Sequence, residues 1–405
     1  MDLNDIRISN SNCIGFMRYF FAFSLIIVHF CSLADVECLW PVNGGLRVKF
    51  FFSITGFLVT YSFLRSRNIF IYVRKRFLRI IPAYATCILF CLLLGLVLTT
   101  LPKSDFICSS ETRKYFLSNI VMLNWLHPCL PGVFVDNYMP QMNGSLWSMK
   151  FEMLFYVTVP AYIFLIRRFS AKRVVPILLI AIMLSYNHLP IQFQYSCFFI
   201  AGSCVLLLFD WLEKYWKVLL PVCGVVFAVI NFAELPESRW LDYIFPIIDL
   251  LTFPVLILLL AYHIPCLNRF GRSNNISYGM YLYHFPIIQF LLSTSPFSQM
   301  PVFIEVRSHY LRNRVTPFST VYVGYSIPMG SSSGGDNAIQ IATGGPTWGF
   351  SVGARYAFSR KMGVSAYIGY QGIYMGRVER KVDGLLSNAR PQLLQNIKVG
   401  VGFNF

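Results

Sequence analysis

The first long apolar run of the chain reads Ile14-Gly-Phe-Met-Arg-Tyr-Phe-Phe-Ala-Phe-Ser-Leu-Ile-Ile-Val-His-Phe30. Its length is close to the roughly 20 residues that a helix needs to cross a bilayer. Lipid offers no partner to an open backbone, so such a run predicts a membrane-spanning helix. Arg18 and His29 lie inside the run, where basic side chains are costly and therefore candidates for function.

Similar runs recur as far as residue 297. Together with the first run they predict nine spanning helices, of which the fifth and seventh are short. Their ranges are 14–30, 48–64, 80–100, 147–166, 173–187, 191–209, 217–232, 241–262 and 276–294. The predicted fold of residues 1–297 is therefore an all-α polytopic membrane bundle.

The composition agrees with a membrane protein. Of the 405 residues, 56% are hydrophobic and only 13% are charged, and the mean hydropathy is +0.57. Soluble domains carry about 25% charged residues, so this chain has too little polar surface for a soluble enzyme. The same numbers exclude a disordered protein and a coiled coil.

The net charge of +16 is an excess of the kind that could indicate a nucleic-acid partner. Basic residues cluster in short runs between apolar segments, which indicates cytoplasmic loops and not a nucleic-acid partner. With the N-terminus in the cytoplasm, the two long connections 31–47 and 101–146 face outward. The connections that then face the cytoplasm are 65–79, 167–173, 210–216 and 263–275.

The sequence changes character after residue 297. Residues 298–405 hold 15 of the 26 glycines, and their apolar residues alternate, as in Trp348-Gly-Phe-Ser-Val-Gly-Ala-Arg-Tyr-Ala-Phe358. This period of two predicts a β-rich segment that resembles the C-terminal strands of an outer-membrane barrel; a loose glycine-rich β tail is the alternative. The segment has room for some four to six strands, fewer than the about 8 strands of the smallest closed barrel. We therefore divide the chain into domains 1–297 and 298–405 and interpret the junction as a fusion or an assembly artefact.

Several polar residues lie at or near membrane depth. Arg18 and His29 are 11 residues apart, about three turns, so both face one side of their helix, roughly 16 Å apart along its axis. The alternative is that Arg18 reaches the membrane interface and His29 makes a structural hydrogen bond. Glu152, Asp249 and His284 are further candidates, each with a structural polar contact as the alternative.

A compact basic cluster follows the second predicted helix. Arg74, Arg76 and Arg79 fall within a few residues of one another, and guanidinium groups pair well with phosphate oxygens. The cluster therefore indicates either a phosphate-binding patch or ordinary anchoring at the cytoplasmic surface.

Five short motifs occur in order along the helical part. They are Arg18 with His29, Phe51-Phe-Ser-Ile-Thr-Gly-Phe57, Lys75 to Pro82, Ser145 to Glu152, and Ser277 to His284. This combination resembles the type-3 acyltransferase family over residues about 10–296. The chain departs from the family pattern at Thr55 and Lys75, and after the ninth helix, where the family supplies at least one more helix.

The resemblance implies a membrane-bound O-acyltransferase of the bacterial inner membrane. Such an enzyme moves an acyl group, most often acetyl, from acyl-CoA to a hydroxyl of a surface polysaccharide or a lipid-linked sugar. His29 is the expected general base, Arg18 helps to position the donor, and Glu152 contributes on the acceptor side. Arg74, Arg76 and Arg79 would bind the phosphates of acetyl-CoA or another acyl-CoA. The cysteine and histidine spacing predicts no metal site.

Two other classes remain as alternatives. A transporter or flippase of lipid-linked saccharides would use the same intramembrane residues as a polar pathway, but no inverted repeat is visible. Consumption of acetyl-CoA separates it from the enzyme. Residues 298–405 alone suggest a structural outer-membrane protein. Separation of membranes by density tests this alternative, because location in the inner membrane excludes it.

Overall fold

The computed structural model describes most of the chain. The described residues are 8–9, 11–35, 44–233, 238–263, 277–294, 299–309, 314–328, 339–341, 345–357, 363–375, 378–382, 385–389 and 392–404. The chain divides into two compact units, one of residues 1–30 and 39–290 and the other of residues 31–38 and 291–405.

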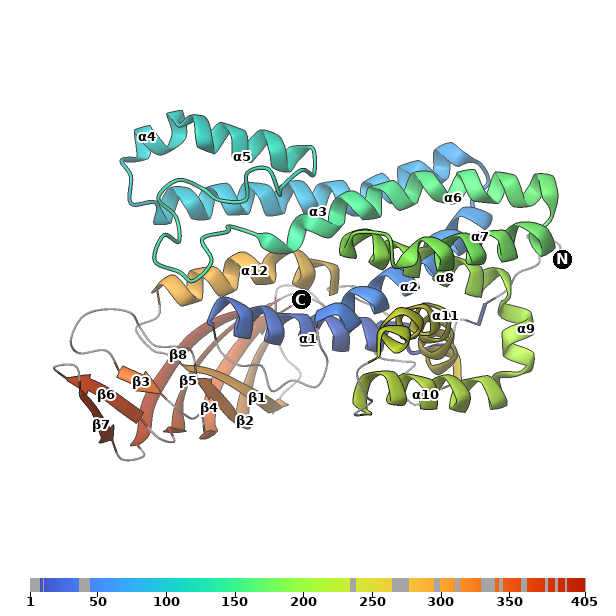
Figure 1. The fold of residues 1–405 in the computed structure, drawn as a ribbon. Helices are drawn as coiled ribbons and strands as arrows, with labels where there is room; N and C mark the ends of the chain where they lie inside the picture. The colour runs from blue at the N-terminus through green and yellow to red at the C-terminus, as the bar shows by residue number, and fades with distance from the viewer. Residues whose placement is uncertain are drawn as a thin grey trace. The chain divides into compact units, whose positions relative to one another are not determined.

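The first unit is helical (Figure 1). In chain order its elements are α1 (Ile14–Leu33), α2 (Gly44–Leu64), α3 (Ile69–Leu98), α4 (Lys103–Cys108), α5 (Ser110–Ile120), the 3₁₀ helix η1 (Gly144–Ser148), α6 (Met149–Phe169), α7 (Ala171–Tyr186), α8 (Ile191–Leu207), α9 (Phe209–Lys214), α10 (Trp216–Phe232), α11 (Arg239–His263) and α12 (Ser277–Thr294). The ends of α1 and α12 belong to the second unit.

A helix occupies each of the nine segments predicted to span the membrane. Four stretches of helix among the described residues are long and apolar enough to cross a bilayer, namely Ile14–Leu33, Ile69–Leu98, Gly144–Phe169 and Arg239–His263. Shorter apolar helices follow at Ile191–Leu207 and Trp216–Phe232. The prediction of a mostly helical membrane bundle is confirmed.

The start of α3 differs from the prediction. The helix begins at Ile69, so the basic cluster placed in a cytoplasmic loop lies within the helix. The side chain of Asn68 caps it by accepting a hydrogen bond from the backbone N–H of Ile71. The buried face of this part of α3 is formed by Tyr72, Arg76 and Ile80, which follow one another at intervals of four residues. A turn with charged residues on its exposed side has a low mean hydropathy, so a search for apolar runs places the start of the helix too late.

Two glycines bring α2 and α8 together. A Cβ atom added at Gly56 would lie 2.0 Å from the carbonyl oxygen of Phe199, and one at Gly202 would lie 2.1 Å from that of Ser53. The hydroxyl of Ser203 also donates to the carbonyl of Gly56 at 3.1 Å. Small residues that let two backbones touch are typical of helix pairs in membranes. This contact holds α2 against the rest of the first unit.

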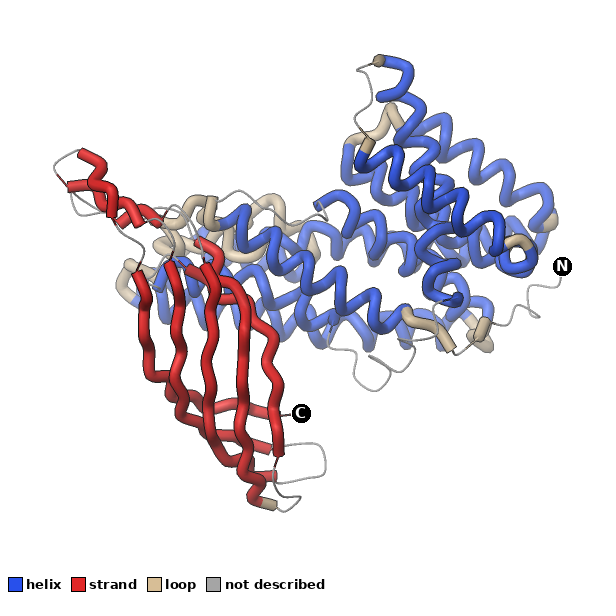
Figure 2. Tube along the Cα trace, turned by 90° about the horizontal axis from the view of Figure 1, so that it is seen from below, coloured by secondary structure: helices blue, strands red, loops and turns tan. Residues whose placement is uncertain are grey.

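The second unit contains a five-stranded antiparallel sheet (Figure 2). Its strand order is β1-β2-β4-β5-β8, with β1 and β8 at the open edges. Its strands are β1 (Gln299–His309), β2 (Val315–Pro328), β4 (Gly345–Ala357), β5 (Gly363–Met375) and β8 (Gln392–Asn404). A second sheet has the order β3-β6-β7, with β3 (Ile339–Ile341), β6 (Val378–Val382) and β7 (Leu385–Ala389). The prediction of a β-rich segment is confirmed.

The two faces of the larger sheet differ in chemistry. In β4 the buried positions include Thr347 and Ser351, whereas Trp348, Phe350 and Val352 between them are exposed. On the buried side, the hydroxyl of Thr347 donates to the carbonyl of Gly372 in β5 at 3.1 Å. Within β4 the alternation therefore places small and polar residues on the buried face and large apolar residues on the other, and Phe318 and Tyr322 of β2 lie opposite Gly353 and Gly349 on that buried face.

Candidate active site

A cavity of about 390 Å³ lies in the first unit, bordered by α1, α2, α3, η1, α6, α8 and α12. Most of the residues predicted to form the site line it, namely Arg18, His29, Arg76, Arg79 and Glu152. Arg74 is exposed on α3 and is not among the lining residues. The cavity thus brings together all five motifs: the pair on α1, the basic motif of α3, the serine motifs of η1 and α12, and the phenylalanine-rich motif of α2. The phenylalanine-rich motif of α2 supplies its apolar wall, through Phe51 and Phe52.

α1 carries two of these residues on one face. Arg18, Leu25 and His29 all line the cavity, and their spacings of seven and eleven residues are close to whole helical turns. The helix therefore exposes a guanidinium at one level of the cavity and an imidazole about three turns further along.

The basic end of the cavity is formed by α1, α3 and α6. The guanidinium of Arg76 lies 5.8 Å from the ring centroids of both Tyr72 and Tyr156, in cation–π contact. The hydroxyl of Tyr156 donates to Glu152 Oε1 at 2.8 Å. Arg18 interacts electrostatically with Arg79 and Glu152. Glu152 therefore lies with the arginines, and three cations outnumber one carboxylate there.

The other end of the cavity holds histidine. His29 Nδ1 lies 2.6 Å from Nε2 of His284, which is on α12 and only 5% exposed. The ring of Phe285 meets His29 edge-on, with 5.6 Å between the ring centroids. His29 also interacts electrostatically with Arg47, which is 0% exposed and donates from Nη1 to the carbonyl of Ser24 at 2.5 Å.

The two serine motifs bind each other. Asn143 donates from Nδ2 to the carbonyl of Leu282 at 2.9 Å and accepts from the Ser145 hydroxyl at 2.6 Å. The Tyr281 hydroxyl lies 2.6 Å from the hydroxyl of Ser148 and donates to the carbonyl of Ser145. These bonds fix α12, and with it His284, against the start of α6.

Sequence reasoning missed Arg47, Tyr278 and Tyr281, which also line the cavity. Arg47 fell one residue outside the predicted second helix, because α2 begins at Gly44 and not at residue 48. The signal for the two tyrosines was present in the motif from Ser277 to His284, where both lie on the turns before the histidine.

Asp249 makes a structural contact instead of a site contact. Its Oδ2 atom accepts from Lys49 Nζ at 2.6 Å, and the carboxylate is 2% exposed. Neither residue is among those that line the cavity. The pair joins α2 to α11, and a buried charge of this kind needs such a partner.

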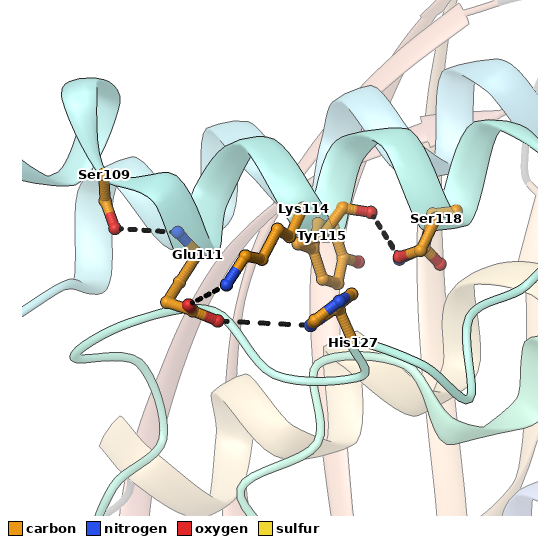
Figure 3. A network of polar contacts seen from close by, with 7 residues as sticks. Ser109, Glu111, Lys114, Tyr115, Ser118 and His127 are labelled. Atoms are coloured by element: carbon orange, nitrogen blue, oxygen red, sulfur yellow. Dashed lines mark hydrogen bonds and ion pairs between the residues drawn. The ribbon is translucent and has the colours of Figure 1, made fainter.

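A polar network lies on α5 and the segment after it, outside the predicted spans (Figure 3). The Glu111 carboxylate accepts from Lys114 Nζ at 2.9 Å, and its second oxygen lies 4.0 Å from His127 Nδ1. The hydrogen bond and charge of Lys114 hold the pKa of Glu111 below its ordinary value. The Ser109 hydroxyl accepts from the N–H of Glu111 at 3.1 Å and caps α5.

Comparison with known proteins finds a family and several related sequences. A family model described as an acyltransferase domain matches residues 11–328. The chain is 25% identical over 305 residues to an O-acetyl transferase of Shigella phage Sf6, covering 70% of this chain and 86% of that protein. It is 24% identical over 335 residues to O-acetyltransferase OatA of Staphylococcus aureus strain NCTC 8325, covering 72% of this chain and 52%, about half, of that protein.

No solved structure matches the chain significantly. The family match runs past residue 297 and covers β1 and β2, beyond the range of the sequence resemblance. It covers more than half of the chain and includes every residue that lines the cavity. The chain therefore belongs to the acyltransferase 3 family and is a multi-pass membrane O-acyltransferase.

Proposed function

We propose that this protein transfers an acetyl group from acetyl-CoA, with another acyl-CoA as the alternative donor, to a hydroxyl of a cell-surface polysaccharide or a lipid-linked sugar. The proposal places it in a bacterial cytoplasmic membrane with its N-terminus in the cytoplasm. The observation that carries it is that one cavity joins an arginine-rich end to a histidine. The names of the phage and staphylococcal relatives support an acetyl group and an oxygen acceptor.

The arginine-rich end suits the phosphates of the donor. Arg76 Nε and the Tyr278 hydroxyl are buried and have no hydrogen-bond partner within the described part of the chain. Buried polar groups are nearly always paired, so two unpaired donors on the wall of a cavity favour a polar ligand there. Guanidinium groups bind phosphate through two parallel hydrogen bonds, which Arg76 and Arg79 can offer.

The apolar wall of the cavity suits the arm that carries the acyl group. Side chains of α2 form much of this wall, including Val48, Phe51, Phe52 and Leu58. Arg18 and His29 are roughly 16 Å apart along α1, by the rise of an α-helix. A donor with phosphates at one end and a thioester at the end of an extended arm spans such a distance, whereas a compact donor does not.

His29 would act as general base in the transfer. A neutral imidazole accepts the proton of the acceptor hydroxyl, and the oxygen forms a bond with the acyl carbonyl carbon. The bond from that carbon to the donor sulfur then breaks, and the leaving thiolate takes the proton back from His29. The contacts of Arg18 with Glu152 and of Glu152 with Tyr156 favour the donor end for both residues, so we propose that Glu152 orients Tyr156 and the arginines and does not act on the acceptor side.

Transfer of labelled acetyl to membrane glycan tests this function. The protein in nanodiscs is given acetyl-CoA labelled in the acetyl group, with His29→Ala as the test variant. His188→Ala is the matched control, because His188 is exposed and does not line the cavity. We expect transfer by the wild type and the control, and loss of at least about 100-fold in His29→Ala. Equal transfer by all three contradicts the role of His29. Flipping of a lipid-linked sugar without consumption of acetyl-CoA would favour a transporter.

A further inference from the structure

The proposed role of His29 requires one particular ring nitrogen to be free of its proton. Neutral imidazole has one N–H and one bare nitrogen, and the contacts of each nitrogen decide which is which. In this chain those contacts come from a second histidine, His284 on α12. The inference below rests on the proposed function and concerns how His284 prepares His29 for it.

The protonation of His284 follows from its neighbours. Its Nδ1 atom lies 3.0 Å from the carbonyl oxygen of Met280 and 2.9 Å from that of Tyr281. Carbonyl oxygens only accept hydrogen bonds, so Nδ1 must carry the proton. In the neutral ring Nε2 is then bare and acts as an acceptor.

The protonation of His29 follows in turn. Its Nδ1 lies 2.6 Å from the bare Nε2 of His284, and a hydrogen bond between two ring nitrogens needs a single proton between them. That proton must reside on Nδ1 of His29. The remaining nitrogen, Nε2, is therefore bare, and it belongs to a side chain that lines the cavity.

We propose that His284 is a positioning residue that holds His29 in the Nδ1–H tautomer and so presents its Nε2 atom as the base. His284 does not line the cavity itself, so it acts through His29. When His29 takes up a proton, the hydrogen bond to His284 and the two carbonyls behind it stabilise the positive charge.

The packing of α12 keeps His284 next to His29. Tyr281, one turn before His284, is bonded to Ser145 and Ser148. Phe285, the next residue, packs edge-on against His29. The helix therefore has little freedom to turn its histidine away.

Two substitutions of His284 separate positioning from general structure. In His284→Gln the side-chain oxygen is able to accept from His29 Nδ1, whereas His284→Leu has no acceptor. We expect kcat to fall about 100-fold in His284→Leu, the loss typical of a misplaced catalytic group, with the KM for acetyl-CoA unchanged. His284→Gln should recover at least about tenfold of that loss. Equal loss in both variants, or a rise in KM alone, overturns the proposal.

A spectroscopic measurement reads the tautomer without activity. With ¹⁵N-labelled histidine, NMR distinguishes bare from protonated ring nitrogens, and His29→Ala identifies the signals of His29. We expect a protonated Nδ1 and a bare Nε2 in the wild type and in His284→Gln, and a mixture of tautomers in His284→Leu. The matched control is His263→Leu, which removes a histidine that stacks on Trp216 outside the cavity.

The two readouts distinguish this inference from the proposed function. If the tautomer is as expected but no acetyl is transferred, the function fails and the positioning stands. If His29 keeps the same tautomer in His284→Leu, or carries its proton on Nε2 in the wild type, the positioning fails. Transfer by the wild type would still support the function in that case.

Discussion

At the scale of single residues, the basic cluster on α3 divides into members that face the cavity and one that does not. Arg76 and Arg79 line the cavity, whereas Arg74 is absent from its wall. The spacing of three residues between Arg76 and Arg79 places both on one side of a helix, and Arg74 lies on another. Three arginines that look equivalent in the sequence should therefore differ in function.

Substitution of these arginines tests that difference. We expect Arg79→Gln to raise the KM for acetyl-CoA about tenfold or more, because a hydrogen bond to a charged group contributes about 1.5–3 kcal/mol. Arg74→Gln is the matched control and should leave KM within about twofold. Steady-state kinetics at constant ionic strength measures both. Equal effects of the two substitutions would mean that the cluster acts only through its overall charge.

A pH dependence belongs to Glu111, which lies outside the predicted spans. Lys114 lowers the pKa of Glu111 in the folded protein, so the carboxylate contributes stability above its ordinary pKa of 4.5. That contribution is lost as the pH falls through the lowered value. We expect wild type to be slightly more stable than Glu111→Gln at pH 7 and equal to it in acid.

Thermal unfolding in detergent between pH 7 and pH 3 measures the gap between these two proteins. The gap should also shrink at high salt, because both partners are exposed and screened by ions. A gap that is constant across the pH range would mean that Glu111 contributes through packing and not through its charge.

At the scale of elements, the contact of α2 with α8 depends on two glycines. Ala at position 202 would bring a Cβ atom to 2.1 Å from the carbonyl oxygen of Ser53, so the two helices must move apart. We expect Gly202→Ala to lower the free energy of unfolding by about 1–3 kcal/mol, as overpacking does. Gly224→Ala in α10 is the matched control, because nothing lies within 4 Å of a Cβ atom there.

The control should be neutral or stabilising, because Ala favours a helix over Gly by about 1 kcal/mol. Thermal unfolding in one detergent compares the two variants. Activity should fall with Gly202→Ala as well, since α2 carries much of the cavity wall. Equal stability of both variants would mean that the two helices adjust to the added methyl group.

The helices could be predicted from the sequence, but their ends and their long-range contacts could not. Apolar runs predicted a helix at each of the nine segments, because the bilayer requirement acts on the whole segment at once. The runs failed at helix ends, as at Ile69 and Gly44, where charged side chains share a turn with buried ones. Arg47 was lost for that reason. The contact between His29 and His284 joins residues 255 positions apart, and no local pattern predicts such a distance.

At the scale of the whole molecule, two boundaries disagree. The composition changes near residue 297 and the compact units divide near residue 290, but the family match continues to residue 328. All residues that line the cavity, from Arg18 to Tyr281, lie in the first unit. No described residue of the sheet lines the cavity, so the geometry of the site does not require the sheet. The family match, in contrast, includes the first two strands, β1 and β2.

Truncation decides between these boundaries. We expect a chain ended after residue 297 to keep acetyl transfer within about tenfold of the full chain, when compared at equal amounts in the membrane. A chain ended after residue 328 should be no more active, and it leaves β2 without its partner β4. An exposed strand edge of that kind favours aggregation, so this chain should accumulate less. If the chain ended at 297 is inactive while the one ended at 328 transfers acetyl, then residues 298–328 are part of the acyltransferase.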